Sequence, residues 1–280
     1  MARTVRGARV LITGAAGGMG RLYAERAVLE DARSVILWDA DEYALDQTAA
    51  DLRASAGPET SVYDYAVDLR ELGAIAQTAH RVRRDAGDPD ILINNAGIVR
   101  GRLFWEHNSG DDIRATMQVN ALAPMYVTRE FLPAMINAAY RAARIVNIAS
   151  AAGLVSNPRM SVYAASKSAV IGWSDSLRLE LLREDHGNVK VTTVSPSYVS
   201  TGMFAGARGP LLAPVMTPEY VVDRVWRAML AGKPELVLPR SIGVARALKG
   251  VLPPRAWDAI AGPILGVYSS MDEFTGRSRP

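Results

Sequence analysis

The sequence predicts an α/β protein built as a single domain, with helices on both faces of a parallel sheet. Three observations lead to this prediction. Short apolar runs of strand length alternate with longer stretches of helical periodicity through the first 239 residues, and strands buried on both faces have this near-continuous apolar character. A length of 280 residues lies within reach of one large α/β domain. No internal repeat and no linker rich in glycine and serine divides the chain.

Seven strands are expected, at residues 9–13, 34–39, 61–67, 90–94, 144–149, 190–195 and 235–239. Between them lie segments long enough for crossover helices, at residues 19–31, 42–55, 70–86, 111–140, 162–184 and 218–231. Crossover helices join parallel strands, so residues 1–239 are expected to form a doubly wound, seven-stranded parallel sheet. Such sheets bind ligands beyond the carboxyl ends of their strands, and the chemistry is expected there.

Composition excludes several classes of protein. With 49% hydrophobic and 22% charged residues, the chain has the make-up of a globular protein, not of a disordered or fibrous one. It has no cysteine, and its three histidines, His80, His107 and His186, are scattered, so no disulfide, cysteine nucleophile or metal site is expected. No window reaches the roughly 18 apolar residues of a membrane span. Because no basic and apolar leader opens the sequence, a cytoplasmic location is expected.

The net charge of +3 resides in the last part of the chain. Residues 1–239 carry 26 basic and 26 acidic residues, and residues 240–280 carry six basic and three acidic ones. The body of the protein is therefore neutral and has no dense stripe of Lys and Arg, so a nucleic-acid partner is not expected.

A glycine-rich turn follows the first strand. Residues 13–20 read Thr-Gly-Ala-Ala-Gly-Gly-Met-Gly and lead directly into a helical pattern. Glycines at such a turn allow a pyrophosphate to approach the backbone at a helix N-terminus. Asp39 ends the second strand, nineteen residues after Gly20, where a carboxylate can accept hydrogen bonds from an adenosine ribose. The pattern predicts a Rossmann-type dinucleotide site; a tight turn without a ligand, with Asp39 as a helix cap, is the alternative.

A serine, a tyrosine and a lysine follow the fifth strand. Ser150 comes at its carboxyl end, and Tyr163 and Lys167 share one helix face at positions i and i+4. A phenol with a pKa near 10 is a poor base at neutral pH, and a nearby ammonium group has the right sign to lower that pKa. Tyr163 is therefore expected to act as a general base toward an alcohol or as an acid toward a carbonyl. Ser150 is expected to donate a hydrogen bond to the same substrate oxygen.

Taken together, these motifs resemble those of the short-chain dehydrogenase/reductase family. Thr-Gly-x-x-x-Gly-x-Gly, a strand-end serine and Tyr-x-x-x-Lys occur in the family order, and Asn120 and the residues 94–97, Asn-Asn-Ala-Gly, fit as well. The resemblance covers roughly residues 7–239. It implies reversible hydride transfer between a nicotinamide cofactor and an alcohol or carbonyl carbon, and a catalytic tetrad of Asn120, Ser150, Tyr163 and Lys167.

The resemblance also assigns residues to the cofactor. Asp39 would contact the adenosine ribose, Asp68 the adenine, and Lys167 the nicotinamide ribose. Asn120 would hold a water that passes the proton to solvent. The full set of expected contacts is Gly14, Gly17, Gly18, Met19, Gly20, Asp39, Asp68, Leu69, Asn95, Ala96, Gly97, Tyr163, Lys167, Pro196, Val199 and Thr201.

Two features bear on the choice between NAD and NADP. A carboxylate at Asp39 would repel the 2′-phosphate of NADP, and Gly17 stands where NADP-preferring relatives often carry a basic residue. NAD is therefore the expected cofactor. The family commonly has Pro-Gly after the sixth strand, whereas this chain has Pro196 and Ser197. The family pattern therefore does not predict the conformation of the backbone that faces the cofactor there.

The substrate is expected to be a lipophilic alcohol or ketone. Residues 200–217 interrupt the strand and helix alternation and are expected to form a lid over the site. The expected substrate contacts are Ser150, Tyr163, Leu154, Val155, Tyr198 and Phe204, and Met203, Leu211, Leu212, Val215 and Met216 would add an apolar lining. The alternative is that these side chains only pack the lid onto the core.

Residues 240–280 form an extension in which basic and apolar residues alternate. It is similar to the C-terminal extensions of retinol and 17β-hydroxysteroid dehydrogenases, including the segment from Met271 to Arg277. Three placements remain open: over the substrate cleft, on a neighbouring subunit, or on an anionic membrane surface.

Two other functions remain as alternatives. One is an NADPH-dependent reductase of ketones or 3-oxoacyl groups, against which Asp39 argues. The other is a sensor that binds NAD without catalysis, for which a damaged tetrad would be expected. By the family resemblance, the long helices at 111–140 and 162–184 are expected to form the contacts of a homodimer or homotetramer.

Overall fold

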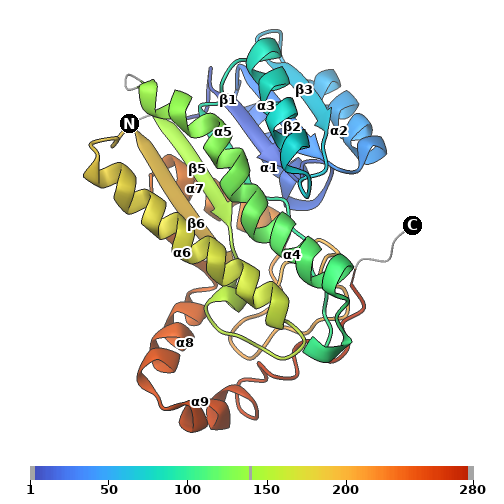
Figure 1. Ribbon diagram of the computed structural model, residues 1–280, viewed down its shortest axis with the longest axis vertical. Coiled ribbons are helices and arrows are strands. Elements are labelled where there is room, and N and C mark those ends of the chain that lie inside the picture. The colour runs from blue at the N-terminus through green and yellow to red at the C-terminus, as the bar shows by residue number, and fades with distance from the viewer. Residues whose placement is uncertain (1–3, 139–140, 277–280) are drawn as a thin grey trace.

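The computed structural model describes residues 4–138 and 141–276, so Tyr140 and Arg277, which the sequence includes in an expected helix and in the tail segment, lie outside the described residues. It confirms the predicted fold class. Seven parallel strands form one sheet in the order β3-β2-β1-β4-β5-β6-β7 (Figure 1). The strands are β1 (Arg9–Thr13), β2 (Ser34–Asp39), β3 (Ser61–Ala66), β4 (Ile91–Asn94), β5 (Ala143–Ile148), β6 (Val189–Pro196) and β7 (Glu235–Leu238).

Helices cover both faces of this sheet. On one face α1 (Gly18–Leu29), α2 (Glu42–Ser55) and α7 (Pro218–Leu230) enclose an apolar cluster with the strands; on the other, α3 (Leu72–Asp85), α5 (Ala123–Asn137) and α6 (Ser161–Arg183) enclose a second one. Figure 1 shows α5 and α6 side by side in front of the sheet. β5 is buried along its whole length, including its two polar residues, Arg144 and Asn147.

The helix expected over residues 111–140 is not one regular α-helix. It begins with the π-helical segment Ser109–Arg114, passes through the short α4 (Ala115–Met117), and has a second π-helical segment, Gln118–Leu122, before α5. A π-helical turn contains an extra residue and often marks a functional site. Hydrophobic periodicity predicts the presence of the helix but does not reveal these wider turns.

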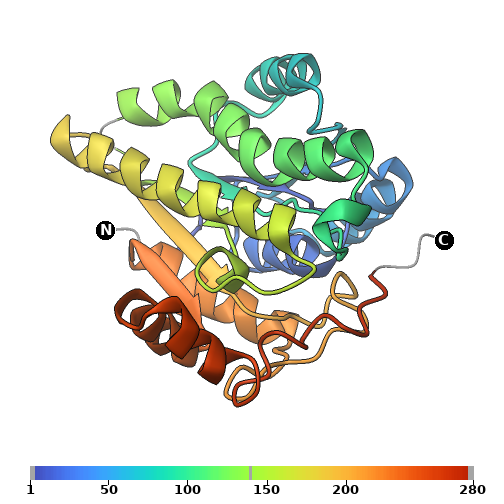
Figure 2. The same ribbon diagram turned by 60° about the horizontal axis from the view of Figure 1, so that its bottom comes forward.

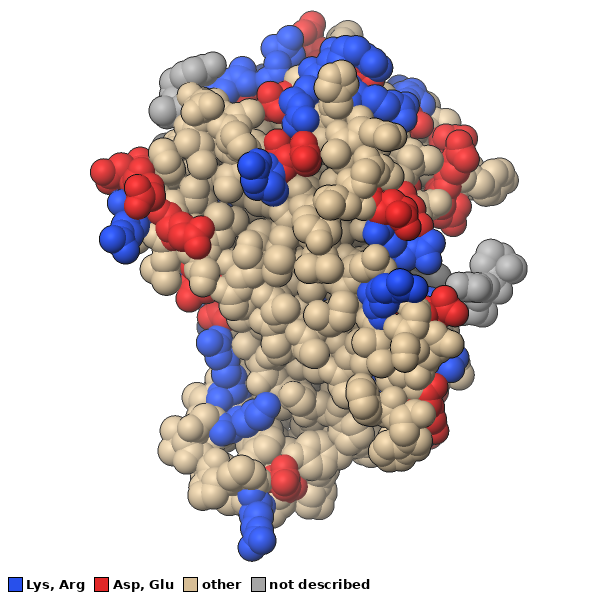
Figure 3. Space-filling model, in the orientation of Figure 1, with Lys and Arg blue, Asp and Glu red and all other residues tan. Residues whose placement is uncertain are grey.

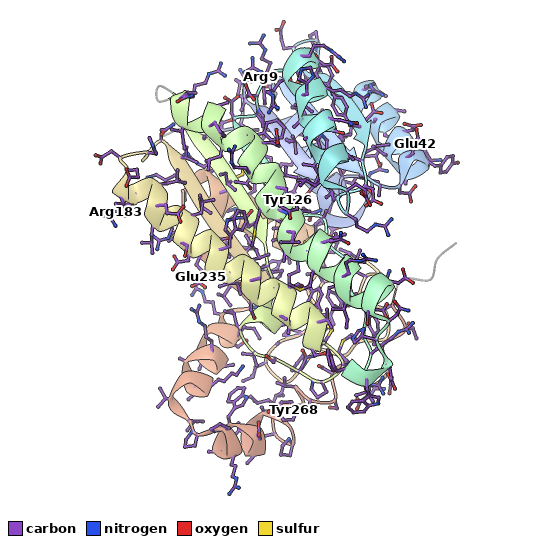
Figure 4. The ribbon with its side chains drawn as sticks, viewed as in Figure 1. Arg9, Glu42, Tyr126, Arg183, Glu235 and Tyr268 are labelled. Carbon is purple, nitrogen blue, oxygen red and sulfur yellow. The ribbon has the colours of Figure 1, made fainter. Side chains whose placement is uncertain are left out.

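The C-terminal extension from residue 240 onward is called the tail below. Its described part, residues 240–276, contains two helices that the sequence did not predict, α8 (Arg240–Val251) and α9 (Pro254–Ala261). They lie at the end of the molecule where the strands have their carboxyl ends, as Figure 4 shows by placing Tyr268 of the tail far from Arg9 at the start of β1. Trp257 and Ala261 of α9 are buried against Val155, which follows β5. Residues 240–276 thus pack on the end of the domain at which the strands have their carboxyl ends.

In the described residues, no helix is both long enough and apolar enough to cross a membrane.

Candidate active site

The glycine-rich turn between β1 and α1 depends on glycine at three positions. Gly14 and Gly18 have φ values of 67° and 54°, in the left-handed region that favours glycine. A Cβ atom on Gly14 would lie 2.8 Å from the Cα atom of Ala96, and one on Gly20 would lie 1.9 Å from the carbonyl oxygen of Gly14. A Cβ atom on Gly17, in contrast, would meet no atom within 4 Å. The turn therefore packs tightly on the protein at Gly14 and Gly20, whereas there is free space next to Gly17, in front of the first turn of α1.

The first turn of α1 is suited to an anion. It contains no acidic residue, and the residue before it, Gly17, has no side chain to cap the helix. The exposed backbone N–H groups and the helix dipole favour negative charge at this point. The residues present therefore fit the pyrophosphate of a dinucleotide.

Thr13 and Asn95 hold this turn to the end of β4. The Thr13 hydroxyl accepts hydrogen bonds from the backbone N–H groups of Asn95 and Ala96, both at 3.1 Å. The Asn95 amide donates to the carbonyl oxygens of Thr13 and Gly14, at 3.0 and 3.1 Å. Asn95, which the sequence predicts to be a cofactor contact, therefore also holds the turn in place. Thr13 received no role from the sequence, where it appears only as the first letter of the motif.

The two expected acidic residues, Asp39 and Asp68, both lie at strand ends and both have partners. Asp39 Oδ2 accepts a hydrogen bond from the Ala16 N–H at 2.9 Å, which ties β2 to the glycine turn. Asp68 accepts hydrogen bonds from the Arg70 side chain, which lowers the pKa of its carboxyl group. Of the two carboxylates, Asp39 is thus held beside the glycine turn, and Asp68 is held by Arg70.

The other positions expected to contact a cofactor divide into two groups. Gly97 and Thr201 face the site: a Cβ atom on Gly97 would lie 3.3 Å from Asn120 Oδ1, and one on Gly18 would lie 3.4 Å from the Cβ atom of Thr201. Pro196 ends β6, and its carbonyl oxygen faces the Ser150 hydroxyl at 3.5 Å. Leu69 and Val199 instead belong to the apolar core, and Met19 packs against it.

Tyr163 and Lys167 lie in the first half of α6, as the spacing predicts. Both side chains are buried, and the Lys167 Nζ atom lies 5.7 Å from the centre of the Tyr163 ring. The ammonium group donates a hydrogen bond to the Ile148 carbonyl oxygen at 2.8 Å. Burial lowers the pKa of Lys167 to about 8, because the charged form loses its hydration.

Burial acts in the opposite direction on Tyr163. It raises the pKa of the phenol to about 12, and the nearby Ser150 hydroxyl lowers it by a smaller amount. The sequence predicts that Lys167 lowers the Tyr163 pKa, but in the protein alone the cost of burying a phenolate is the largest effect and raises it. Tyr163 is therefore protonated at neutral pH and can donate a proton.

Ser150 reaches this pair because of a close contact between backbones. It begins a 3₁₀ turn, Ala151–Gly153, in which its hydroxyl accepts a hydrogen bond from the Ala152 N–H. A Cβ atom on Gly153 would lie 2.8 Å from the Lys167 carbonyl carbon and 2.9 Å from the Ser168 nitrogen. Gly153, which the sequence reasoning missed, thus lets the turn rest directly on α6.

Asn120 lies in the second π-helical segment and is completely buried. Its side chain accepts from the Ile98 N–H and donates to the Ile98 carbonyl oxygen, both at 2.8 Å, and it also donates to the Ser166 hydroxyl at 3.2 Å. Asn120 therefore joins the loop after β4 to α6. Ser166 has no distinctive spacing in the sequence that would predict this contact.

A second buried network lies directly below the site. The Asn94 amide donates to Asn147 Oδ1 at 2.8 Å and to the Thr128 hydroxyl at 3.0 Å, and the Asn147 amide donates to the Ser174 hydroxyl at 2.9 Å. These bonds connect β4 and β5 with α5 and α6. They fix the two helices that carry Asn120 and Tyr163 relative to the strand ends.

A mainly apolar cavity of about 240 Å³ opens beside Ser150. Of the expected substrate contacts, Ser150, Val155, Tyr198 and Phe204 line it, together with Leu211 and Leu212. Tyr163 is not among the lining residues but packs against Phe204, which is, with ring centres 5.9 Å apart. Other expected lining residues lie elsewhere: Leu154 packs on the tail, Met203 joins the cluster around Tyr163, Val215 is exposed, and Met216 is in the core.

The tail supplies much of this cavity wall. Ile242, Val244, Ala245 and Leu248 of α8 line it, as do Leu265, Val267 and Ser270 after α9. The segment after α9 runs beside residues 200–217 (Figure 2), where the Leu211 and Arg208 N–H groups donate to the carbonyl oxygens of Leu265 and Ser270. Met271 is buried in the cluster that contains Tyr163.

This arrangement of strand ends, glycine turn and Ser-Tyr-Lys site has known counterparts. The family model of short chain dehydrogenases matches residues 8–210. The chain belongs to this family. Family membership makes the protein an oxidoreductase by class.

Within the short-chain dehydrogenase family, the chain is similar to retinol dehydrogenases. It is 37% identical over 283 residues to epidermal retinol dehydrogenase 2 of Mus musculus, a match that covers 99% of this chain and 88% of that protein. Among solved structures it is similar to a short chain dehydrogenase/reductase from Burkholderia phymatum in complex with NAD, with a TM-score of 0.78 and 27% identity over 89% of this chain and 95% of that one. A short-chain dehydrogenase from Sphingobium yanoikuyae in complex with NADPH has a TM-score of 0.72 and 27% identity over 88% and 97% of the two chains.

Proposed function

We propose that the protein is an NAD-dependent dehydrogenase that transfers a hydride between the nicotinamide and the carbinol or carbonyl carbon of a lipophilic alcohol or ketone. The observation that carries the proposal is the position of Ser150 on the wall of an apolar cavity, close enough to Tyr163 to lower the pKa of its phenol. A polar reacting end and an apolar wall fit an alcohol group on a lipophilic body. The similarity to retinol dehydrogenases supports the same class of substrate.

In this mechanism a bound nicotinamide would donate or accept the hydride, and the protein's side chains transfer the proton. Ser150 donates a hydrogen bond to the substrate oxygen. Tyr163 gives that oxygen a proton when a ketone is reduced and takes one when an alcohol is oxidised. Lys167, held by the Ile148 carbonyl oxygen, places a positive charge beside the phenol. Asn120 positions the loop after β4 and lies next to Gly97.

Asp39 supports NAD in preference to NADP. Its carboxylate stays beside the glycine turn because the Ala16 N–H holds one of its oxygens. A 2′-phosphate at the ribose would be repelled by this charge. The similar solved structures include one with NAD and one with NADPH, so an NADPH-dependent ketone reductase is the second candidate.

The face over α5 and α6 is proposed as the contact between subunits of a homodimer or homotetramer. In Figure 3 the centre of this face is mostly free of Lys, Arg, Asp and Glu, which gather toward its edges. Leu179 and Leu182 of α6 are exposed large apolar side chains. Depletion of charge with exposed apolar residues is typical of subunit interfaces.

Calorimetric titration of the purified protein with NAD, NADH, NADP and NADPH tests the proposal before any substrate is known. We expect tight binding of NADH and weak binding of NADPH, followed by oxidation of retinoids, steroids or long-chain alcohols in a screen. A preference for NADPH would favour the ketone reductase. Normal NADH binding without turnover of any alcohol or ketone would favour the sensor, and absence of nucleotide binding would overturn the proposal.

A further inference from the structure

Exposed apolar side chains gather at the mouth of the substrate cavity. Fifteen large hydrophobic side chains are exposed in the described part of the chain, and seven of them come from residues 211–215 and 244–264. They are Leu211, Leu212, Val215, Val244, Leu248, Val251 and Ile264. Four of the seven, Leu211, Leu212, Val244 and Leu248, also line the cavity. The cavity therefore opens between two apolar segments, and we call these seven residues the rim.

The part of the rim on α8 has the periodicity of a helix that binds a surface. Val244, Leu248 and Val251 stand at positions i, i+4 and i+7, so they form one stripe. No residue of α8 is classed as buried, and Val251 is 84% exposed. An apolar helical stripe normally packs on the core, whereas this one leaves most of its large side chains in contact with solvent.

The part of the rim before α7 holds a leucine in an unfavourable backbone conformation. Leu212 has a φ of 67° and is 67% exposed. Leu212 lies in the turn closed by the hydrogen bond from the Ala213 N–H to the Pro210 carbonyl oxygen. The Leu212 carbonyl oxygen accepts a hydrogen bond from the Ser241 hydroxyl of α8. A residue with a Cβ atom loses about 1 kcal/mol or more in this region, where glycine would be free of strain. The strain holds a large apolar side chain at the mouth of the cavity, largely in contact with solvent, and strain of this kind points to a binding role.

Basic residues accompany the rim. Helices α8 and α9 carry Arg240, Arg246, Lys249 and Arg255, against one acidic residue, Asp258. Arg246 pairs with Glu235 of β7, whereas no ion pair within the described residues involves the other three cations. Apolar side chains flanked by such cations match the acyl region and the anionic headgroups of a lipid bilayer.

We propose that the rim docks on an anionic lipid bilayer, so that the cavity opens into the lipid and the substrate enters from the acyl region. The proposal rests on the proposed function, because only a lipophilic substrate benefits from this route. A bilayer suits the rim better than a second copy of the chain does. A two-fold contact centred on α8 would bring the cations of the two copies together.

Sedimentation with vesicles tests the docking directly. The probe is the full chain mixed with vesicles of phosphatidylcholine, with or without phosphatidylglycerol. We expect binding that requires phosphatidylglycerol and weakens as salt is added, because salt screens the cations. A triple variant, Val215→Glu, Val251→Glu and Ile264→Glu, should bind at least about tenfold less, since three apolar contacts are replaced by charges that the surface repels. None of these three side chains lines the cavity beside Ser150.

A matched control changes three exposed apolar residues outside the rim, Leu29→Glu, Tyr43→Glu and Leu72→Glu. This variant should bind vesicles like the unaltered protein. Tyr163→Phe should also bind normally, and the rim variant should keep its turnover of a short, water-soluble alcohol, which separates a failure of docking from a failure of the proposed function. No binding to anionic vesicles, or equal loss in the rim and control variants, would overturn the proposal. So would concentration-dependent self-association that only the rim variant abolishes, which would identify a second copy as the occupant.

Point substitutions are preferable to removal of residues 240–280. Trp257 and Met271 of this segment are buried, and Met271 packs in the cluster around Tyr163. Deletion would therefore disturb the active site together with the rim.

Discussion

The hydroxyl groups of Tyr198 and Ser270 lie 2.9 Å apart and join the segment after β6 to the tail. The Asn157 amide donates to both of them, at 3.2 Å each, and the Ser270 hydroxyl donates to the Val267 carbonyl oxygen at 2.7 Å. Tyr198 therefore donates to Ser270, and every proton of this cluster has an acceptor. The Tyr198 ring packs against Phe204, with centres 5.3 Å apart, and Phe204 packs against Tyr163. The tail thus contacts Tyr163, the proposed proton donor, through two aromatic rings.

Substitution at this joint should weaken substrate binding more than the chemical step. Ser270→Ala leaves the Tyr198 hydroxyl buried without its acceptor, which should lower the free energy of unfolding by about 1–3 kcal/mol. We expect KM to rise severalfold with a smaller change in kcat, measured by steady-state kinetics and urea unfolding. Tyr198→Phe should reproduce the effect. Full additivity of the two changes in a double variant would show that the hydroxyls do not interact.

Tyr163→Phe should remove the proton donor and leave the cofactor site intact. Loss of a general acid or base lowers rates by roughly 10²–10⁴-fold. We expect turnover in both directions to fall by at least this range, with NADH affinity by calorimetry unchanged. Normal turnover would refute the role of Tyr163.

The dependence of the two directions on pH should have opposite signs. The protein holds the Tyr163 pKa at about 12, and the positive charge of the oxidised nicotinamide would shift it downward. Because oxidation needs the phenolate, kcat/KM for the alcohol should rise by up to about tenfold per pH unit below that pKa. Ketone reduction needs the phenol and should fall above it. Profiles of both directions over the same buffers test this, and a rate of oxidation that falls as pH rises would contradict it.

Lys167→Met should stabilise the fold at neutral pH and abolish turnover. Burial lowers the Lys167 pKa from 10.5 to about 8. Below pH 8 the folded protein therefore contains a buried positive charge that lowers its free energy of unfolding. The unaltered protein should therefore gain stability relative to the variant as pH rises from about 8 to 10.5, by up to about 3 kcal/mol in all. Urea unfolding of both proteins at a series of pH values measures this gain. A constant difference would show that the folded state does not lower this pKa.

Asp39→Asn should change the choice of cofactor with little effect on the glycine turn. The amide oxygen still accepts the Ala16 N–H, but the negative charge is gone. Affinity for NADP should rise relative to NAD, and the ratio of the two dissociation constants by calorimetry measures the shift. Asp39→Ala should shift the ratio in the same direction and loosen the turn as well. An unchanged ratio in both variants would show that Asp39 does not read the ribose.

Local pattern was enough to predict the sheet and to bring Ser150, Tyr163 and Lys167 together. The central strands β1, β2 and β4 are apolar runs buried over most of their length, and a spacing of four residues places two side chains on one helix face. The predicted bounds of β1, β2 and α2 agree with the structure to the residue.

What pattern did not predict depends on contacts between distant segments. Leu154 and Val155 are adjacent and both apolar, yet Val155 lines the cavity and Leu154 packs on the tail. Whether a lining residue faces the cavity depends on α8 and α9, whose packing has no signature in the sequence. The raised pKa of Tyr163 likewise follows from burial by Phe204 and its neighbours, which the spacing of a motif cannot express.

The two π-helical turns before α5 make the position of Asn120 sensitive to chain length. Each residue of a regular helix advances it by about 100° around the axis. Loss of a single residue between Gln118 and Leu122 would let the backbone become an ordinary α-helix, with its hydrogen bonds intact. Because a π-helical turn takes up its extra residue within the turn, the helix on either side of the loss would keep its orientation. The residues inside the segment would shift around the axis, and Asn120 would leave Ile98. A one-residue deletion here would thus be mild for the helix and severe for the active site.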